Sequence, residues 1–105
     1  MVVVSDRALK ILGLFLGGMD AAAIAFWPFI ICASSTKITP ELINHERIHL
    51  KQQQELLIIP FYIWYLIAYY RKGYYNVSFE KEAYSNEKNL KYLEKRSIFA
   101  FRKYL

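Results

Sequence analysis

The chain has 105 residues, about the size of one domain, and its 14 lysines and arginines exceed its nine aspartates and glutamates to give a net charge of +5. Hydrophobic residues make up 55% of the chain and charged residues 22%, a balance that excludes an intrinsically disordered protein. The lone cysteine, Cys32, excludes an intramolecular disulfide framework and a cysteine-rich zinc site. The composition predicts a single domain over residues 1–105, in which any metal chemistry uses histidines and carboxylates.

The excess positive charge lies in the C-terminal third of the chain. Residues 71–105 carry nine basic and four acidic side chains, whereas residues 1–70 carry five of each. Such a basic segment either keeps the protein solvated or contacts anionic lipid at a membrane surface. Acidic residues are interspersed with the basic ones and no nucleic-acid-binding motif accompanies them, so we expect no nucleic-acid partner.

Two interpretations fit the N-terminal stretch 9–32, which is mostly apolar and long enough to cross a bilayer. It is either a signal peptide or membrane span, interrupted by Asp20 and Pro28, or a helix followed by a strand. In the second case the helix ends near a turn at Gly17-Gly18, and the strand covers Ala25–Cys32. Because proline donates no backbone hydrogen bond, Pro28 would confine that strand to a sheet edge.

The next segment has a clear helix start. Thr39 is a typical N-cap residue, Pro40 suits the first helical position, and Glu41 complements the positive end of the helix dipole. Pro60 crowds the preceding turn and lacks a donor, so it should mark the far boundary. We therefore predict a helix from Pro40 to about Ile59.

An apolar and aromatic segment, Leu56–Tyr70, follows. Its fifteen residues fall short of the roughly 20 that a helix needs to cross the hydrocarbon of a bilayer. Three interpretations stay open: a buried helix, an interfacial segment anchored by tryptophan and tyrosine, and a tight span helped by the basic residues after it. Periodicity alone does not separate them.

The motif that carries chemistry is His45-Glu46-Arg47-Ile48-His49, an H-E-x-x-H sequence inside the first predicted helix. Residues four apart lie on one helix face, so the two imidazoles can bind one Zn²⁺ through nitrogen. The carboxylate of Glu46 then lies beside the metal, where a general base is needed. His45 and His49 are the only histidines in the chain, and we predict them as zinc ligands with Glu46 as the catalytic base.

A catalytic zinc ion needs a third protein ligand, which must here be a carboxylate. Ser78 is a plausible N-cap for a second helix from Phe79 to about Lys95. The candidates were Glu55, Glu80, Glu82 and Glu87. Glu55 lies too far around the first helix, and Glu80 and Glu82 point roughly 160° apart, so only one of them can face the ion.

We predict Glu82 as the third ligand, because its helix face continues through Ala83, Asn86 and two leucines, a stripe suited to packing on a partner helix. Asn86, one turn later, would hydrogen-bond the free ring nitrogen of a ligand histidine. Glu80 shares its face with Tyr84 and other polar residues, which we expected to face solvent.

These residues resemble the zincin metallopeptidases. The histidine motif followed by Glu82-Ala83-Tyr84-Ser85-Asn86 is similar to the gluzincin branch, whose glutamate helix reads E-A-x-S-D, and stretch 39–53 resembles the active-site helix of small bacterial zincin-like proteins. The resemblance implies a mostly α, zincin-like mini-domain with an active-site helix, a glutamate helix and a short edge strand that can pair with an extended substrate. It implies the same ligands, base and supporting asparagine.

The expected function is a zinc-dependent hydrolase, a minimal metallopeptidase acting on peptides or proteins in a bacterial cytoplasm or at its membrane. Two alternatives use the same residues differently. One is a non-catalytic zinc-binding module in which His45, His49 and Glu82 join two helices. The other is a membrane-associated interaction protein that acts through the apolar segment. The sequence leaves the substrate, the oxyanion-stabilising residue and the oligomeric state open.

Overall fold

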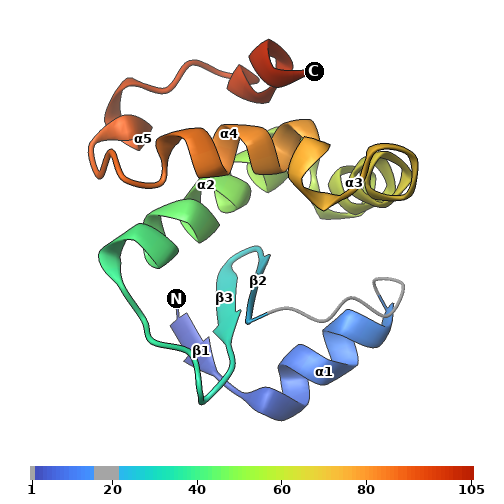
Figure 1. Ribbon diagram of the computed structural model, residues 1–105, viewed down its shortest axis with the longest axis vertical. Helices are drawn as coiled ribbons and strands as arrows, with labels where there is room; N and C mark the ends of the chain where they lie inside the picture. Colours follow the sequence, from blue (N-terminus) through green and yellow to red (C-terminus); the bar gives the residue numbers. More distant parts are fainter. Residues whose placement is uncertain (1, 16–21) are drawn as a thin grey trace.

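The computed structural model describes residues 2–15 and 22–105 (Figure 1). The described chain is mostly helical with a small three-stranded sheet, which confirms the expected mostly α class. The strands are β1 (Val2–Val4), β2 (Ala23–Phe26) and β3 (Phe29–Cys32). The α-helices are α1 (Asp6–Phe15), α2 (Pro40–Leu56), α3 (Ile58–Lys72), α4 (Ser78–Asn86) and α5 (Tyr92–Lys95), and the 3₁₀ helices are η1 (Tyr74–Asn76) and η2 (Ala100–Tyr104).

The sheet has the strand order β1-β3-β2, with β1 parallel and β2 antiparallel to the central strand. Both Val3 and Ile24 lie opposite Ile31. The expected single strand Ala25–Cys32 is wrong, because the chain reverses direction between β2 and β3. Pro28 lies in that turn, where its missing N–H removes no hydrogen bond from the sheet.

The described part of the N-terminal stretch contains a helix followed by extended chain, as in the second interpretation, but with two strands in place of one. Helix α1 has only ten residues, and β2 and β3 account for residues 23–26 and 29–32. The turn expected at Gly17-Gly18 lies outside the described residues. Among the described residues, no helix has both the length and the apolar character needed to cross a bilayer.

Helix α2 begins where the sequence predicts. The hydroxyl of Thr39 accepts a hydrogen bond of 3.1 Å from a first-turn backbone N–H, and Pro40 occupies the first helical position. The helix ends at Leu56 and not near Ile59, because Leu57 adopts a φ of 66° that interrupts the helical path. Pro60 falls inside the first turn of α3, where a backbone N–H has no helical partner to lose.

Most of segment 56–70 forms helix α3, which is buried on one side and exposed on the other, and no described helix is long and apolar enough for the tight span. Helix α3 buries Phe61 and Tyr65 in the main hydrophobic core. The other buried members of that core are Val77, Phe79 and Phe101. A second core lies between α1 and the sheet and contains Leu9, Ile24 and Ile31. Because Tyr62 and Leu66 of α3 pack against both cores, α3 ties the two halves of the molecule together.

The expected helix 79–95 is divided. Helix α4 ends at Asn86, a turn follows, and α5 begins only at Tyr92. The side-chain amide of Asn44 in α2 donates to the carbonyls of residues 86, 87 and 89 at 2.8–3.2 Å. These contacts satisfy carbonyls at the end of α4 that a longer helix would use itself. The stripe predicted to continue from Glu82 therefore stops, and Leu90 is 56% exposed.

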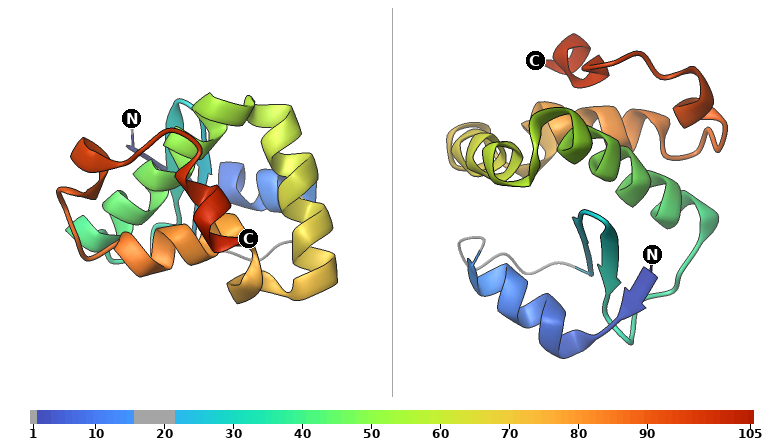
Figure 2. Two further views of the ribbon diagram at one scale, coloured as in Figure 1. Left: turned by 90° about the horizontal axis from the view of Figure 1, so that it is seen from above. Right: turned by 180° about the vertical axis from the view of Figure 1, so that it is seen from behind.

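The elements are stacked with α2 near the middle (Figures 1 and 2). The sheet and α1 lie on one side of α2, and α4 with the C-terminal segment lies on the other. Helix α3 runs along one side of the stack. A side chain on α2 can therefore reach both β2 and α4, and this arrangement positions the site described next.

Candidate metal centre

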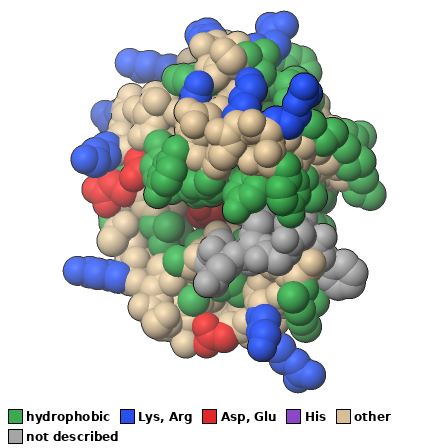
Figure 3. All heavy atoms as spheres, turned by 45° about the vertical axis from the view of Figure 1, so that its right-hand side comes forward, with side chains coloured by type: hydrophobic (Ala, Val, Ile, Leu, Met, Phe, Trp, Pro, Cys, Tyr) green, Lys and Arg blue, Asp and Glu red, His purple; other side chains and the backbone are tan. Residues whose placement is uncertain are grey.

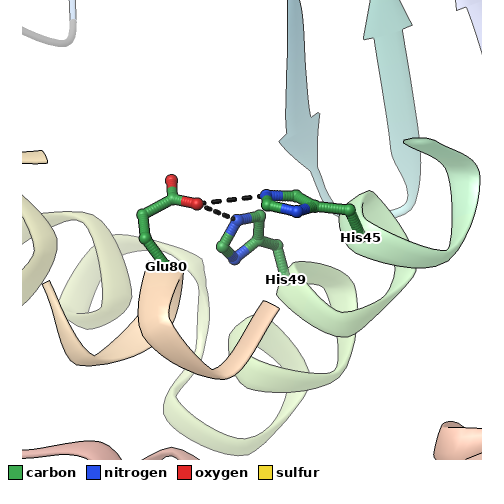
Figure 4. Close-up of side chains that lie close together, drawn as sticks. All are labelled: His45, His49 and Glu80. Carbon is green, nitrogen blue, oxygen red and sulfur yellow. Dashed lines mark hydrogen bonds and ion pairs between the residues drawn. The ribbon is translucent and has the colours of Figure 1, made fainter. Parts of the chain in front are cut away.

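Three ligand atoms from α2 and α4 converge (Figure 4). The Nε2 atom of His45 lies 3.1 Å from Oε1 of Glu80, and the Nε2 atom of His49 lies 3.0 Å from the same oxygen. The three atoms lie within 4.8 Å of one another, and all three residues are buried. The structure thus brings the histidine pair to a carboxylate of α4, as the motif predicts, but the carboxylate belongs to Glu80.

Each histidine is held through its second ring nitrogen. Nδ1 of His45 lies 2.7 Å from a carboxylate oxygen of Glu87, and Nδ1 of His49 lies 2.8 Å from the side-chain carbonyl oxygen of Gln52. Both partners accept hydrogen bonds, so they hold a proton on Nδ1 of each ring, and Nε2, which faces Glu80, is the atom available to a metal ion. Metal-binding histidines are typically oriented in this way.

The pocket around Glu80 strongly favours positive charge. Burial alone would raise the pKa of Glu80, but cationic His49 and hydrogen bonds from both histidines and Tyr65 hold it well below its ordinary value. Burial would likewise lower the pKa of His49, but the Glu80 carboxylate raises it to about 9. A cation between the imidazoles, either a proton or a metal ion, would therefore stabilise the buried Glu80 carboxylate.

The three residues could hold a metal ion, and their separations can be compared with those of a zinc site. Ligand atoms that each lie about 2.0–2.1 Å from a tetrahedral ion are about 3.3 Å from each other, close to the nitrogen–oxygen separations found here. Two imidazole nitrogens and one carboxylate oxygen are a typical donor set of catalytic zinc sites. Within residues 2–15 and 22–105 the group consists of three ligands, which leaves a fourth position of a tetrahedral ion for water or substrate.

Glu46 lies next to the ligand group, as expected. It is buried, and its carboxylate accepts a hydrogen bond from the backbone N–H of Ala25 in β2. Burial raises its pKa to about 6, while the neighbouring histidine charges oppose this shift. A carboxylate with a pKa in this range can both accept and release a proton near neutral pH.

The site opens into a cleft of about 590 Å³ between β2, α2 and α4. His45 and Glu46 form part of its wall, and Ala23 of β2 lies opposite the helices. Tyr84 of α4 and Glu87, just after that helix, also border the cleft. The Tyr84 ring packs edge-on against His45 with centroids 4.5 Å apart. A substrate in this cleft would lie against His45 and Glu46. His49 and Glu80 line a smaller cavity of about 50 Å³ that shares Ala23, Glu46 and Tyr74 with the cleft.

Glu82 does not reach the histidines, and the assignment of the third ligand is corrected to Glu80. The Glu82 oxygens accept hydrogen bonds from Gln52 at 2.9 Å, from Tyr92 at 2.7 Å and from the Arg96 guanidinium. Arg96 also pairs with Glu55, at 2.8 Å. Residues two apart on a helix project to nearly opposite sides, so Glu80 faces the histidines and Glu82 faces Arg96.

Asn86 has a different place from the one expected. Its side-chain amide donates to the carbonyl of Glu82 at 2.7 Å and to the hydroxyl of Tyr104 at 3.0 Å. Glu87, the next residue, makes the contact to a ligand histidine that we had predicted for Asn86. Asn86 instead joins the end of α4 to the C-terminal 3₁₀ helix.

A sequence signal for the correct face did exist. Glu80, Tyr84 and Glu87 are spaced i, i+4 and i+7, so they share one side of a helix. The prediction that this polar side of the helix faces solvent is wrong, because it faces the histidines. A buried site that binds a cation is lined by polar groups, so polarity is a poor guide to exposure there. No local pattern would have revealed that Arg96 neutralises Glu82.

Gln52 connects Glu82 to His49. Its amide nitrogen donates to Glu82 and to the carbonyl of Phe79, so its oxygen turns toward His49. Glu82 thereby fixes the direction of the Gln52 amide and, through it, the proton on His49. The glutamine-rich run after the histidine motif thus supports the site.

No family model, curated protein or solved structure matches the chain. The functional assignment below therefore rests on the geometry of the site.

Proposed function

We propose that the protein is a zinc-dependent hydrolase that cleaves peptide bonds, with His45, His49 and Glu80 as metal ligands and Glu46 as the base. The observation that carries this proposal is the buried convergence of the three candidate ligand atoms within 4.8 Å, next to an open cleft that His45 and Glu46 line. A zinc ion held there would supply Lewis-acid chemistry, polarising a substrate carbonyl and lowering the pKa of water.

The chain's own residues divide the remaining work. Glu87 and Gln52 keep His45 and His49 in the tautomer that presents Nε2. The Tyr65 hydroxyl donates to the second oxygen of Glu80 at 2.6 Å and so directs Oε1 toward the histidines. The ligand set is thereby fixed before a metal ion arrives, which reduces the cost of ordering it.

Glu46 is the group that moves the proton. Its carboxylate borders the same cleft as His45, and the N–H of Ala25 holds it in place. We propose that it accepts a proton from the attacking water and passes this proton to the leaving amine nitrogen of the substrate. Tyr84, whose hydroxyl lies 3.0 Å from that of Tyr74, borders the cleft and is the candidate to donate to the developing oxyanion.

The sheet favours an extended peptide as substrate. Strand β2 is at the edge of the sheet, and Ala23 borders the cleft. Farther along β2, Ala25 is already bound by Glu46 and by the Gln53 amide at 2.8 Å. Only the Ala23 end of the described strand is left for pairing with a substrate backbone, so we propose a short main-chain contact.

The test compares the parent with Glu46→Gln and with Glu94→Gln, a matched change at an exposed glutamate outside the cleft. Each protein is loaded with zinc, its metal content is measured, and hydrolysis of a mixed peptide library is followed by mass spectrometry. We expect about one zinc ion per chain in all three, and a loss of hydrolysis of about 100-fold or more in Glu46→Gln alone.

Two results would contradict the proposal. Full zinc content without hydrolysis in the parent would favour the non-catalytic zinc module, in which the metal only joins α2 to α4. A parent protein that binds no zinc would contradict both the hydrolase and the non-catalytic zinc module.

A further inference from the structure

Helix α3 presents an exposed apolar face on the side opposite its core residues. Ile59, Ile63 and Ile67, four residues apart, are 72%, 57% and 53% exposed, and Leu57 and Tyr70 at the two ends are 69% and 66% exposed. We call these five residues the outer α3 face. Large apolar side chains on soluble proteins are seldom exposed as one continuous stripe, and such a stripe marks a binding surface.

Positive charge borders this face of α3. Residues 56–79 and 95–105 contain no aspartate or glutamate. Arg71 and Lys72 are exposed at the end of α3, and Arg102 and Lys103 are exposed on η2. The η2 helix packs on α3 through the rings of Trp64 and Phe101, 5.4 Å apart. Figure 3 shows hydrophobic side chains across this side of the molecule, with lysines and arginines gathered beside them.

The apolar surface continues around the start of α3. A groove of about 670 Å³ lies between the β2–β3 turn and the junction of α2 with α3. It is lined mainly by apolar residues, which include Phe26, Trp27, Leu57, Ile59 and Pro60. Trp27 is 41% exposed at this corner, and Trp64 is 38% exposed farther along α3. Tryptophan and tyrosine beside an apolar stripe are typical of segments that lie at a membrane–water interface.

We propose that the outer α3 face docks on the surface of an anionic lipid membrane. The fifteen-residue helix is too short to span a bilayer but can lie flat, with its isoleucines in the acyl boundary and the basic residues against the headgroups. A second copy of the chain is a poorer occupant of this face, because it would bring exposed arginines and lysines toward their own counterparts. The inference is independent of the metal site.

The test uses the zinc-loaded full chain and co-sedimentation with vesicles of phosphatidylcholine alone or with one quarter phosphatidylglycerol. The variant Ile63→Glu/Ile67→Glu places two negative charges on the outer α3 face. The matched control, Ile38→Glu/Leu90→Glu, changes two exposed apolar residues that lie outside α3 and are 46% and 56% exposed. Circular dichroism and zinc content establish that each variant is folded.

We expect the parent and the control to bind the anionic vesicles, more weakly at high salt, and the α3 variant to partition about 10-fold less or lower. Binding to neutral vesicles should be weaker for every protein. Equal sedimentation of the folded α3 variant and the control would overturn the proposal. A parent protein that binds neither kind of vesicle would also overturn it. In that case, a dimer seen by sedimentation velocity for the parent but not for the α3 variant would assign the face to self-association.

Discussion

Two glutamates only two residues apart have different environments in this molecule. Glu80 shares one oxygen between two imidazoles, whereas Glu82 lies against the Arg96 guanidinium on the far side of α4. Both are buried carboxylates with lowered pKa values, so neither burial nor ionisation separates their roles. The two glutamates differ instead in the cation that lies beside each carboxylate.

Replacing each carboxylate by an amide separates these roles. Glu80→Gln removes a charged ligand, so zinc affinity should fall by more than the roughly 10–100-fold seen when a residue that merely orients a ligand is lost. Glu82→Gln should lower zinc affinity by about 10-fold through Gln52, and should reduce the free energy of unfolding by about 3 kcal/mol because it weakens the buried pair with Arg96. Zinc titration against a chromogenic chelator and urea unfolding measure the two effects.

Glu94→Gln, at an exposed site, serves as the control and should change neither quantity. A selective loss of zinc in Glu82→Gln, with Glu80→Gln unaffected, would restore the original ligand assignment and contradict the geometry described here.

Among the elements, α2 organises the site. One side of it carries the histidines and Glu46, and its C-terminal half carries Gln52 and Gln53. Gln53 binds the backbone of β2 and accepts a hydrogen bond of 2.7 Å from the N–H of Trp27, so it fixes the hairpin to the helix. The path of β2 past Glu46 therefore depends on α2 as much as on its pairing with β3.

The N-cap of α2 gives a prediction for this element. Thr39→Ala removes the hydroxyl that accepts from the Leu42 N–H at 3.1 Å, and should reduce the free energy of unfolding by about 1 kcal/mol. Thr39→Ser keeps the hydroxyl and should retain most of that stability. Urea denaturation followed by circular dichroism measures both. Equal stabilities for the alanine and serine variants would show that this cap does not stabilise the helix.

At the scale of the whole molecule, the candidate metal site joins parts of the chain that are distant in sequence. The ligands on α2 and α4 are separated by 31 to 35 residues, and all of α3 lies between them. An unfolded chain cannot hold these ligands together, so a zinc ion bound at the site should stabilise the folded state through linkage.

Removing the metal should therefore lower the melting temperature. Zinc at about 100 times its dissociation constant contributes about 2.7 kcal/mol, which corresponds to a shift of roughly 10–20 °C for a domain of this size. Differential scanning calorimetry with zinc and with a chelator measures the shift, and the Glu80→Gln variant should show little of it. An identical melting temperature of the parent under both conditions would argue against a site that binds zinc tightly.

The sequence by itself determined the local features. The spacing of His45 and His49 requires only one helical turn, and the start of α2 follows from Thr39 and Pro40, whose effects act within the first turn. The apolar segment 56–70 indicated a helix, although its exposure on one side and burial on the other depend on the packing around it.

Only the tertiary structure decided the features that depend on contacts between distant residues. Asn44 caps the end of α4 and stops the helix that the sequence pattern had continued to Lys95. Arg96, which follows a turn and α5, binds the Glu82 carboxylate, whereas Glu80 contacts the histidines. A carboxylate is directed by the nearest cation as well as by its phase on the helix, and here that cation comes from a part of the chain whose position the local sequence does not encode.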